Sequence, residues 1–483
     1  MRFDKALLEL LPALPLCGAL VLPLGGYIVS VLSKRLGEPA DPRSAGAWAA
    51  TVLAAAVSLF ALAALLMERS SGAFFLFLAV PLPGEWGLVL DALSGPALAL
   101  AALLSLAALV ATFARARGEA ISHGALLAVL GFVVAVILAR DLVQLALSLQ
   151  LMVLACAVAL LFGRERGECR RAALRYFLCA EAGAAIILAV AIRLAQLSPT
   201  TEIADLKQSL PLGDWPALRR LAQWLFWGWL LVAIAPTVPQ AVPEVLSRRP
   251  LPVALMVCGA SFVGAGYAFV RLAYQGFPYR FWAMLSGRMS WAAAALALGG
   301  TLAALFARAP SRRASYTMLA QVGLVCMALS ADPREGPAPA VTVGLALVFI
   351  CAVARAGMLV AGAAGRATSS EQPGPVHRAA HWLALVIIAL SLFGASALTI
   401  IPLSGGRLAG PLLVVPLTSA VAWLWFSYTW TERPRRERLY LVLLCCCAGL
   451  LALFFAAPGP LRRLLGDAVD LLGVEEVFHF LLR

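Results

Sequence analysis

The sequence predicts an all-α polytopic membrane protein, because its composition and its long apolar runs agree. Of its 483 residues, 62% are hydrophobic and only 13% are charged, whereas a soluble globular chain is about 45–50% apolar and about 25% charged. A single soluble core stops growing at roughly 250–300 residues, so this excess of apolar residues requires a lipid environment. The composition therefore excludes a soluble enzyme, a secreted disulfide scaffold and a disordered chain.

Fourteen apolar runs are long enough to cross a bilayer, which takes about 20 residues. The expected spans are about 7–32, 46–67, 89–114, 121–139, 142–162, 172–195, 221–243, 251–274, 290–308, 314–331, 339–364, 379–402, 409–428 and 439–457. Between the second and third spans, Phe74–Leu90 has a Pro-Gly turn signal between two short apolar runs and predicts an extracytoplasmic hairpin. After residue 458, charged and apolar residues alternate at helical spacing, which indicates a segment lying along the membrane surface.

The charges of the loops predict the orientation. The odd-numbered loops hold 20 Lys and Arg residues and the even-numbered loops hold 9. Because basic loops stay in the cytoplasm, the odd loops are expected inside and both termini outside an inner (plasma) membrane. The net charge of +13 fits cytoplasmic loops that face anionic lipid, so a nucleic-acid partner is not expected.

Two of the expected spans are broken by helix-disrupting residues. The seventh contains Pro236, Pro239 and Pro243, and the twelfth ends at Pro402 followed by Gly405. These breaks lie five spans apart, so spans 4–8 and 9–13 form two five-helix repeats that are inverted relative to each other. Matching broken helices in inverted repeats indicate an ion or substrate path near the midplane, although proline kinks can also serve packing alone.

The repeats suggest four regions along the chain. Residues 1–114 would hold three helices with the hairpin, 115–275 the first repeat, 276–430 the second repeat, and 431–483 the last helix and an amphipathic tail.

Several motifs occur in the order found in one family. Ala172–Leu178 reads AALRYFL, with Arg175 where the family has lysine, and Pro243–Val253 reads PEVLSRRPLPV. Tyr267–Leu272 reads YAFVRL, and Ser391–Gly394, SLFG, precedes the second break. This order resembles the antiporter-like membrane subunits of respiratory complex I, and subunit N of NADH-quinone oxidoreductase most of all. The resemblance covers about residues 85–430.

The resemblance implies a place in the membrane arm of a multi-subunit complex that couples quinone reduction to ion pumping. Such a subunit holds no redox centre or cofactor, and quinone would bind elsewhere in the complex. The family moves protons along buried ionisable residues, but this chain has Gln150 at the family's glutamate position. Val232 stands at the lysine position and Pro239 at the histidine position. Because Gln and Val do not titrate, the first half-channel is expected to be degenerate.

A few ionisable residues remain in apolar surroundings, where a charge at a helix centre costs about 2.5–3.5 kcal/mol. The candidates for a proton path or its electrostatics are Arg355, Glu181, Arg407, Asp141 and Arg175. Arginine keeps its proton, so it can set a field but cannot relay a proton. Because no apolar segment near Arg355 offers an acid, its partner is expected outside the chain or in a hydrated cavity. The competing interpretation for each candidate is that its side chain is hydrogen-bonded by a neighbouring helix, lies in solvent or extends to the membrane interface.

The other signals are weaker. The 10 cysteines form no CxxC pair, so a metal or iron–sulfur site is not expected. Two alternatives to a pumping subunit stay open: a structural or accessory subunit without ion conduction, and a subunit of a cation/proton antiporter or inorganic-carbon uptake complex.

Overall fold

The computed structural model describes the N-terminal two thirds of the chain, with gaps. The described residues are 5–36, 42–65, 70–73, 87–91, 93–113, 120–161, 166–210, 215–237, 251–277, 279–307, 310–329, 344–345, 347–349, 351–356 and 358–359. The chain divides into two compact units, Met1–Trp282 and Ala283–Arg483. The expected twelfth to fourteenth spans, with Pro402, Gly405 and Arg407, lie outside the described residues.

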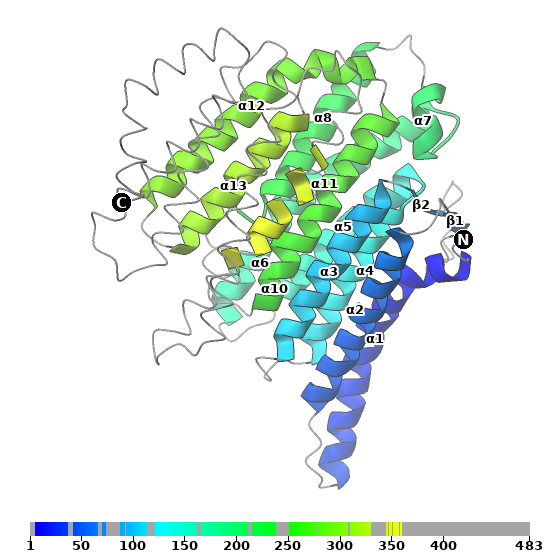
Figure 1. The fold of residues 1–483 in the computed structure, drawn as a ribbon, viewed down its shortest axis with the longest axis vertical. Helices are drawn as coiled ribbons and strands as arrows, with labels where there is room; N and C mark the ends of the chain where they lie inside the picture. The colour runs from blue at the N-terminus through cyan, green and yellow to red at the C-terminus, as the bar shows by residue number, and fades with distance from the viewer. Residues whose placement is uncertain are drawn as a thin grey trace, which may run out of the picture. The chain divides into compact units, whose positions relative to one another are not determined.

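The first unit is a bundle of long helices with a small hairpin at one end (Figure 1). Its elements are α1 (Lys5–Leu36), α2 (Pro42–Leu65), β1 (Ser70–Ala73), β2 (Gly87–Leu90), α3 (Ser94–Phe113), α4 (Ala120–Leu138), α5 (Leu142–Leu161), α6 (Arg166–Leu197), α7 (Ile203–Ser209), α8 (Trp215–Ile234), α10 (Leu251–Leu255), η1 (Met256–Ala260), α11 (Ser261–Arg271) and η2 (Leu272–Gly276). Helix α4 packs against α1 and α5, and α6 packs against α5 and α8.

The helix from Leu251 to Gly276 lies at the centre of this bundle. Its α-helical turns continue through two π-helical segments, η1 and η2, without a break. The residues of α11 are all buried, and Phe269 stacks on Trp229 of α8 with ring centroids 4.5 Å apart. Single-turn π segments inside helices are frequent at functional sites, so this helix is a candidate for the functional site of the unit.

Backbone hydrogen bonds tie three loops together at one end of the unit. Strand β2 pairs antiparallel with β1, and Gly87 O accepts a bond from Arg140 N at 3.0 Å. The α4–α5 turn then bonds the segment before α7, because Leu142 N donates to Thr201 O at 2.9 Å. The second, fourth and sixth loops therefore lie on one side of the unit, as the alternation of the spans predicts.

The described part of the second unit is a helix pair with fragments of a third helix. Helix α12 (Tyr279–Phe306) crosses α13 (Pro310–Leu329). Gly300 lies so close to α13 that an added Cβ would come within 2.7 Å of Ala320 N, and Gly323 meets Ala297 in the same way. Glycine at these two positions allows the backbones to touch. The described residues between 344 and 359 are helical and fall in the expected eleventh span.

The structure corrects several boundaries. The third helix begins at Ser94 rather than near 89, because residues 87–90 form strand β2. The hairpin is present, but its first strand is Ser70–Ala73, before Phe74. The polar connection after α6 contains the short helix α7, which apolar length alone does not reveal. Helix α12 begins at Tyr279, eleven residues earlier than expected.

Three of the described helices are long and apolar enough to cross a membrane. They are Leu142–Leu161, Arg170–Leu197 and Pro252–Gly276. They coincide with the expected fifth, sixth and eighth spans, so apolar length predicted them well. Most of the other described helices have shorter apolar stretches, such as Ser94–Val110 and His123–Leu138. A count of fourteen spans and an inverted repeat stay predictions.

Helices α6 and α8 cross at a pair of glycines. A Cβ added to Gly183 would come within 2.5 Å of Gly228 O, and one added to Gly228 would come within 2.9 Å of Gly183 O. Real Cβ atoms do not approach a backbone carbonyl so closely, so the helices would have to separate. Gly167, near the start of α6, has nothing within 4 Å of an added Cβ.

Alanine substitutions at Gly183 and at Gly167, both in α6, are expected to change the stability of the fold in opposite directions. Gly183→Ala is expected to lower the apparent unfolding temperature in detergent by several degrees, because overpacking costs about 1–3 kcal/mol. Gly167→Ala is the matched control. It is expected to leave that temperature unchanged or raise it slightly, because alanine favours a helix over glycine by up to about 1 kcal/mol. Equal effects of the two substitutions would contradict the close crossing.

Candidate functional site

Asp91 lies where strand β2 passes into helix α3, and it organises that junction. Its Oδ1 accepts hydrogen bonds from Leu93 N at 3.0 Å and from Ser94 N at 2.8 Å. Its own backbone N–H donates to Ser94 Oγ at 2.8 Å. Aspartate is a favoured residue at helix starts because its carboxylate satisfies backbone donors that the helix leaves free. One carboxylate oxygen is thus used to begin α3.

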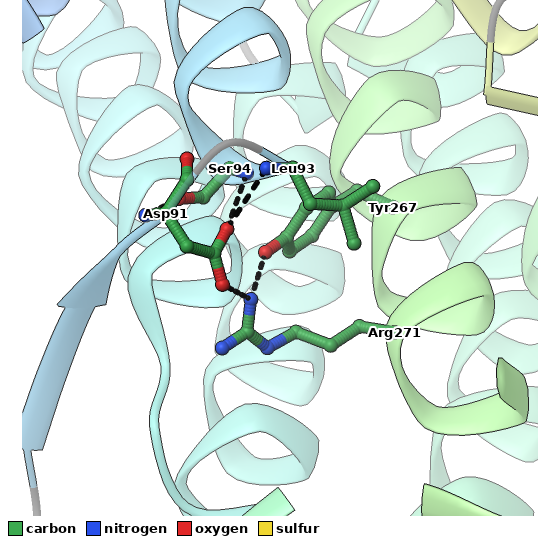
Figure 2. Close-up of polar contacts among 5 residues, drawn as sticks. All are labelled: Asp91, Leu93, Ser94, Tyr267 and Arg271. Carbon is green, nitrogen blue, oxygen red and sulfur yellow. Dashed lines mark hydrogen bonds and ion pairs between the residues drawn. The ribbon is translucent and has the colours of Figure 1, made fainter. Parts of the chain in front are cut away.

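The other carboxylate oxygen of Asp91 pairs with Arg271, which ends α11 (Figure 2). Arg271 Nη1 donates to Asp91 Oδ2 at 2.9 Å and also to the hydroxyl of Tyr267, one turn earlier in the same helix. The guanidinium carbon lies 5.8 Å from the centroid of the Tyr267 ring. The side chain of Arg271 is 3% exposed and that of Asp91 is 17% exposed, so the pair is largely withdrawn from solvent.

The surroundings of Asp91 favour its charged form. Burial by itself would raise its pKa, but the charge of Arg271 and the hydrogen bonds from Ser94 and Arg271 outweigh burial and hold the pKa of Asp91 below its usual value. Asp91 is therefore ionised at neutral pH. Because arginine also keeps its charge, this pair can orient a helix end and set a local field, but it cannot relay a proton.

Sequence reasoning missed this pair. Its two members are separated by 180 positions, and neither lies at the centre of an apolar run. Two local signals were present: Asp91 precedes Ser94 by three residues, as in a helix cap, and Arg271 follows Tyr267 by four, which places both on one helix face. Neither signal identifies the partner across the bundle.

A second buried arginine, Arg355, lies in the second unit and is fully buried. Its Nε donates to Gln321 Oε1 at 3.1 Å and its Nη2 donates to Met318 O at 2.9 Å. Both acceptors belong to α13 and both are neutral. An amide and a backbone carbonyl thus accept hydrogen bonds from these two donors. A further partner outside the chain or in a hydrated cavity stays a prediction.

Asp141 and Arg140 lie on the rim formed by the tied loops. Asp141 is buried, and its Oδ1 accepts hydrogen bonds from Val143 N at 2.7 Å and Gln144 N at 3.1 Å, so it caps the start of α5. Arg140 Nη2 pairs with Glu202 Oε2 at 2.6 Å. This arrangement assigns Asp141 a structural role in the described residues, at the helix start that the sequence placed there.

The remaining candidates are dispersed. Glu181 is half-buried and Arg175 is exposed, both on α6. Gln150 on α5 is half-buried, and Val232 on α8 is buried close to the crossing of α6 and α8. Helix α8 ends at Ile234, just before the buried Pro236, where a turn follows with Thr237 N bonded to Ile234 O at 2.8 Å. Helix α8 thus ends just before Pro236, while Pro239 and Pro243 lie outside the described residues, so a break within the seventh span stays a prediction.

The described residues contain no group of three or more His, Cys, Asp or Glu side chains that could hold a metal ion. The two most buried charged contacts among the described residues are the Asp91–Arg271–Tyr267 cluster in the first unit and the Arg355–Gln321 contact in the second.

Comparison with solved structures identifies the fold. The chain superposes on a chain of respiratory complex I from Thermus thermophilus with a TM-score of 0.66 at 21% identity, covering 96% of this chain and 98% of that one. A chain of the archaeal membrane-bound sulfane sulfur reductase matches with a TM-score of 0.69 at 16% identity, covering 92% and 76%. A chain of the Mrp complex from Dietzia sp. DQ12-45-1b matches with a TM-score of 0.66 at 20% identity, covering 88% and 79%.

No family model and no curated protein matches the sequence. The three structural matches all belong to multi-subunit membrane complexes. The chain thus has the fold of subunits of such complexes, a multi-pass membrane fold. At these identities the likeness concerns the fold alone.

Removing the charge of Asp91 is expected to lower the free energy of unfolding strongly. Asp91→Asn keeps an oxygen that can cap α3 but removes the charge that Arg271 needs. We expect a loss of unfolding free energy on the order of 3 kcal/mol, because breaking a buried pair leaves the other charge uncompensated. The matched control is Asp205→Asn, since Asp205 is exposed on α7. Equal losses in chemical unfolding of the two variants in micelles would refute the role of the pair.

The same pair predicts a dependence on pH. The pKa of Asp91 is lowered in the folded state. Its contribution to the free energy of unfolding is therefore complete above the unfolded-state pKa of about 4, and it disappears as the pH falls through the lowered, folded-state pKa. The difference in stability between the native chain and Asp91→Asn should therefore shrink only in acid below about pH 4. A difference that is constant across that range would contradict the assignment.

Proposed function

We propose that the chain is an antiporter-like subunit in the membrane arm of a complex related to proton-pumping NADH-quinone oxidoreductase, most like subunit N. The observation that carries this proposal is the match of fold over nearly the full length of both chains in the complex I comparison. The motif order AALRYFL, PEVLSRRPLPV and YAFVRL supports the same assignment. On this proposal the chain has no cofactor of its own, its partners are other membrane subunits, and quinone binds elsewhere.

The two units differ in the charged residues that could take part in moving an ion. At the family's charged positions the first unit has Gln150 and Val232, which do not titrate. Val232 is also buried. In the second unit Arg355 is a permanent charge held by neutral oxygens, so it can change the proton affinity of a nearby group without losing its own proton. We therefore place any ion path in the second half of the chain and treat the first half-channel as degenerate.

The proposed location is the inner (plasma) membrane, with both termini on the extracytoplasmic side. The excess of basic residues in the odd-numbered loops supports this orientation. The grouping of the second, fourth and sixth loops at one end of the first unit is consistent with it.

A second function is favoured by one observation. If the neutral Gln150 and Val232 reflect loss of transport in the whole chain, the protein would be an accessory subunit that holds neighbours in place without conducting ions. A third candidate is a subunit of a cation/proton antiporter or carbon-uptake complex, and the match to a chain of the Mrp complex supports it. These candidates share the fold and differ in whether ions cross through this chain.

Arg355 distinguishes a conducting subunit from an accessory one. Arg355→Leu is expected to insert normally, since a buried charge is removed, but to reduce ion pumping by the intact complex at least fivefold. Arg355→Lys should keep part of the pumping, because lysine retains the charge but cannot contact Gln321 and Met318 at once as the planar guanidinium does. The measurements are membrane yield, assembly of the complex, and ions moved per turnover.

The control for these variants is Arg220→Leu, because Arg220 is exposed near the start of α8 and bonds only Pro216 O in the described residues. Normal assembly and normal pumping in Arg355→Leu would overturn the conducting role and favour the accessory one. Loss of assembly in Arg355→Leu with retention in Arg355→Lys would assign the charge to subunit contact instead.

A further inference from the structure

Helix α6 presents a long outward face in the first unit. Among the three candidate spans it is the least buried. The exposed residues of this face recur at helical spacing: Arg171, Leu174, Arg175, Leu178, Ala182, Ala185, Ala189, Ile192 and Arg193. Large apolar side chains lie towards both ends of the face, and three alanines lie between them. The face is therefore low in the middle, where a neighbouring helix can approach closely.

The exposed arginines mark the depth of the face in a bilayer. Arg171 and Arg193 are 22 residues apart, which is about 33 Å along a helix and matches a hydrocarbon core of about 30 Å. Glu181 follows Arg171 by ten residues and precedes Arg193 by twelve. It thus lies about 15 Å from Arg171 and about 18 Å from Arg193, near the midplane, too deep for its short side chain to reach water. Arg175 lies about 9 Å from Glu181, and its long side chain can extend towards the Arg171 end of the helix.

Glu181 is half-buried at the edge of the three alanines. Within the part of the chain that the structure describes, it has no hydrogen-bond or ion-pair partner. Lipid tails cannot hydrogen-bond a carboxyl group, so a half-exposed acid at this depth is unfavourable when lipid alone covers it. The charge of Glu181, its depth in the bilayer and the small alanine side chains beside it together indicate which kind of molecule covers this part of α6.

We propose that this face of α6 binds a transmembrane helix of another subunit that carries a lysine or arginine near the bilayer midplane. The partner helix packs on Ala182, Ala185 and Ala189, and its basic side chain pairs with the Glu181 carboxylate. The charge complementarity decides for a protein partner over lipid, since lipid tails offer no cation at this depth. This inference rests on the proposed membership in a multi-subunit membrane complex, and it does not depend on ion conduction through this chain.

The test is photo-cross-linking in the native membrane with the full chain. A photoreactive amino acid replaces Ala185 on the proposed face, and in a separate control chain it replaces Leu154, which is exposed on α5. We expect an adduct at position 185 that maps to an apolar segment of a different chain containing Lys or Arg. Glu181→Gln should lower the yield of this adduct at least fivefold, Glu181→Asp should lower it less, and neither should change the adducts at position 154.

A charge exchange completes the experiment. Glu181→Lys should abolish the adduct at position 185, and replacing the mapped basic residue of the partner by glutamate should restore it. Adducts to lipid alone, adducts to residues 283–483 of this same chain, a partner segment without a basic residue, or an unchanged yield in Glu181→Gln would each overturn the inference. An intact adduct in a complex that moves no ions through this chain would leave the inference standing and remove only the conducting role.

Discussion

The buried ion pair between Asp91 and Arg271 is the contact on which the first unit depends. It joins the start of α3 to the end of the central helix, two points separated by 180 positions in the chain. Asp91 caps α3 with one carboxylate oxygen and holds the guanidinium with the other. Because the guanidinium cannot neutralise itself, its burial requires polar partners, and Asp91 supplies a charged one. The central helix is thereby fixed against the hairpin side of the bundle.

The same requirement explains the other charges that lie within apolar helices. Arg355 is fully buried and is met by oxygens of Gln321 and Met318, so its charge is hydrogen-bonded without being cancelled by them. Glu181 faces outward at mid-depth without a partner among the described residues. Arg271 thus has an ion pair inside its unit and Arg355 has neutral acceptors, while we propose that Glu181 pairs with a neighbouring molecule.

Several helices of the fold could be predicted from the sequence, because a membrane span must be a long apolar run and such runs are easy to recognise. The fifth, sixth and eighth spans follow from apolar length alone. A hairpin before the third span was predicted from its turn signal, but its first strand, Ser70–Ala73, was not, since that segment does not alternate in polarity. The Asp91–Arg271 pair was missed for a related reason: each residue has an ordinary local role, and their proximity is a property of the assembled bundle.

The central claim is that the two halves of the chain are unequal and that the first does not carry an ion. The most direct measurement is the number of ions moved per electron pair by the intact complex when this chain carries Gln150→Leu. Because Gln150 does not titrate, the account predicts the same number as for the native complex, at the same level of assembly. A lower number would show that the first half-channel conducts after all, and would contradict the account.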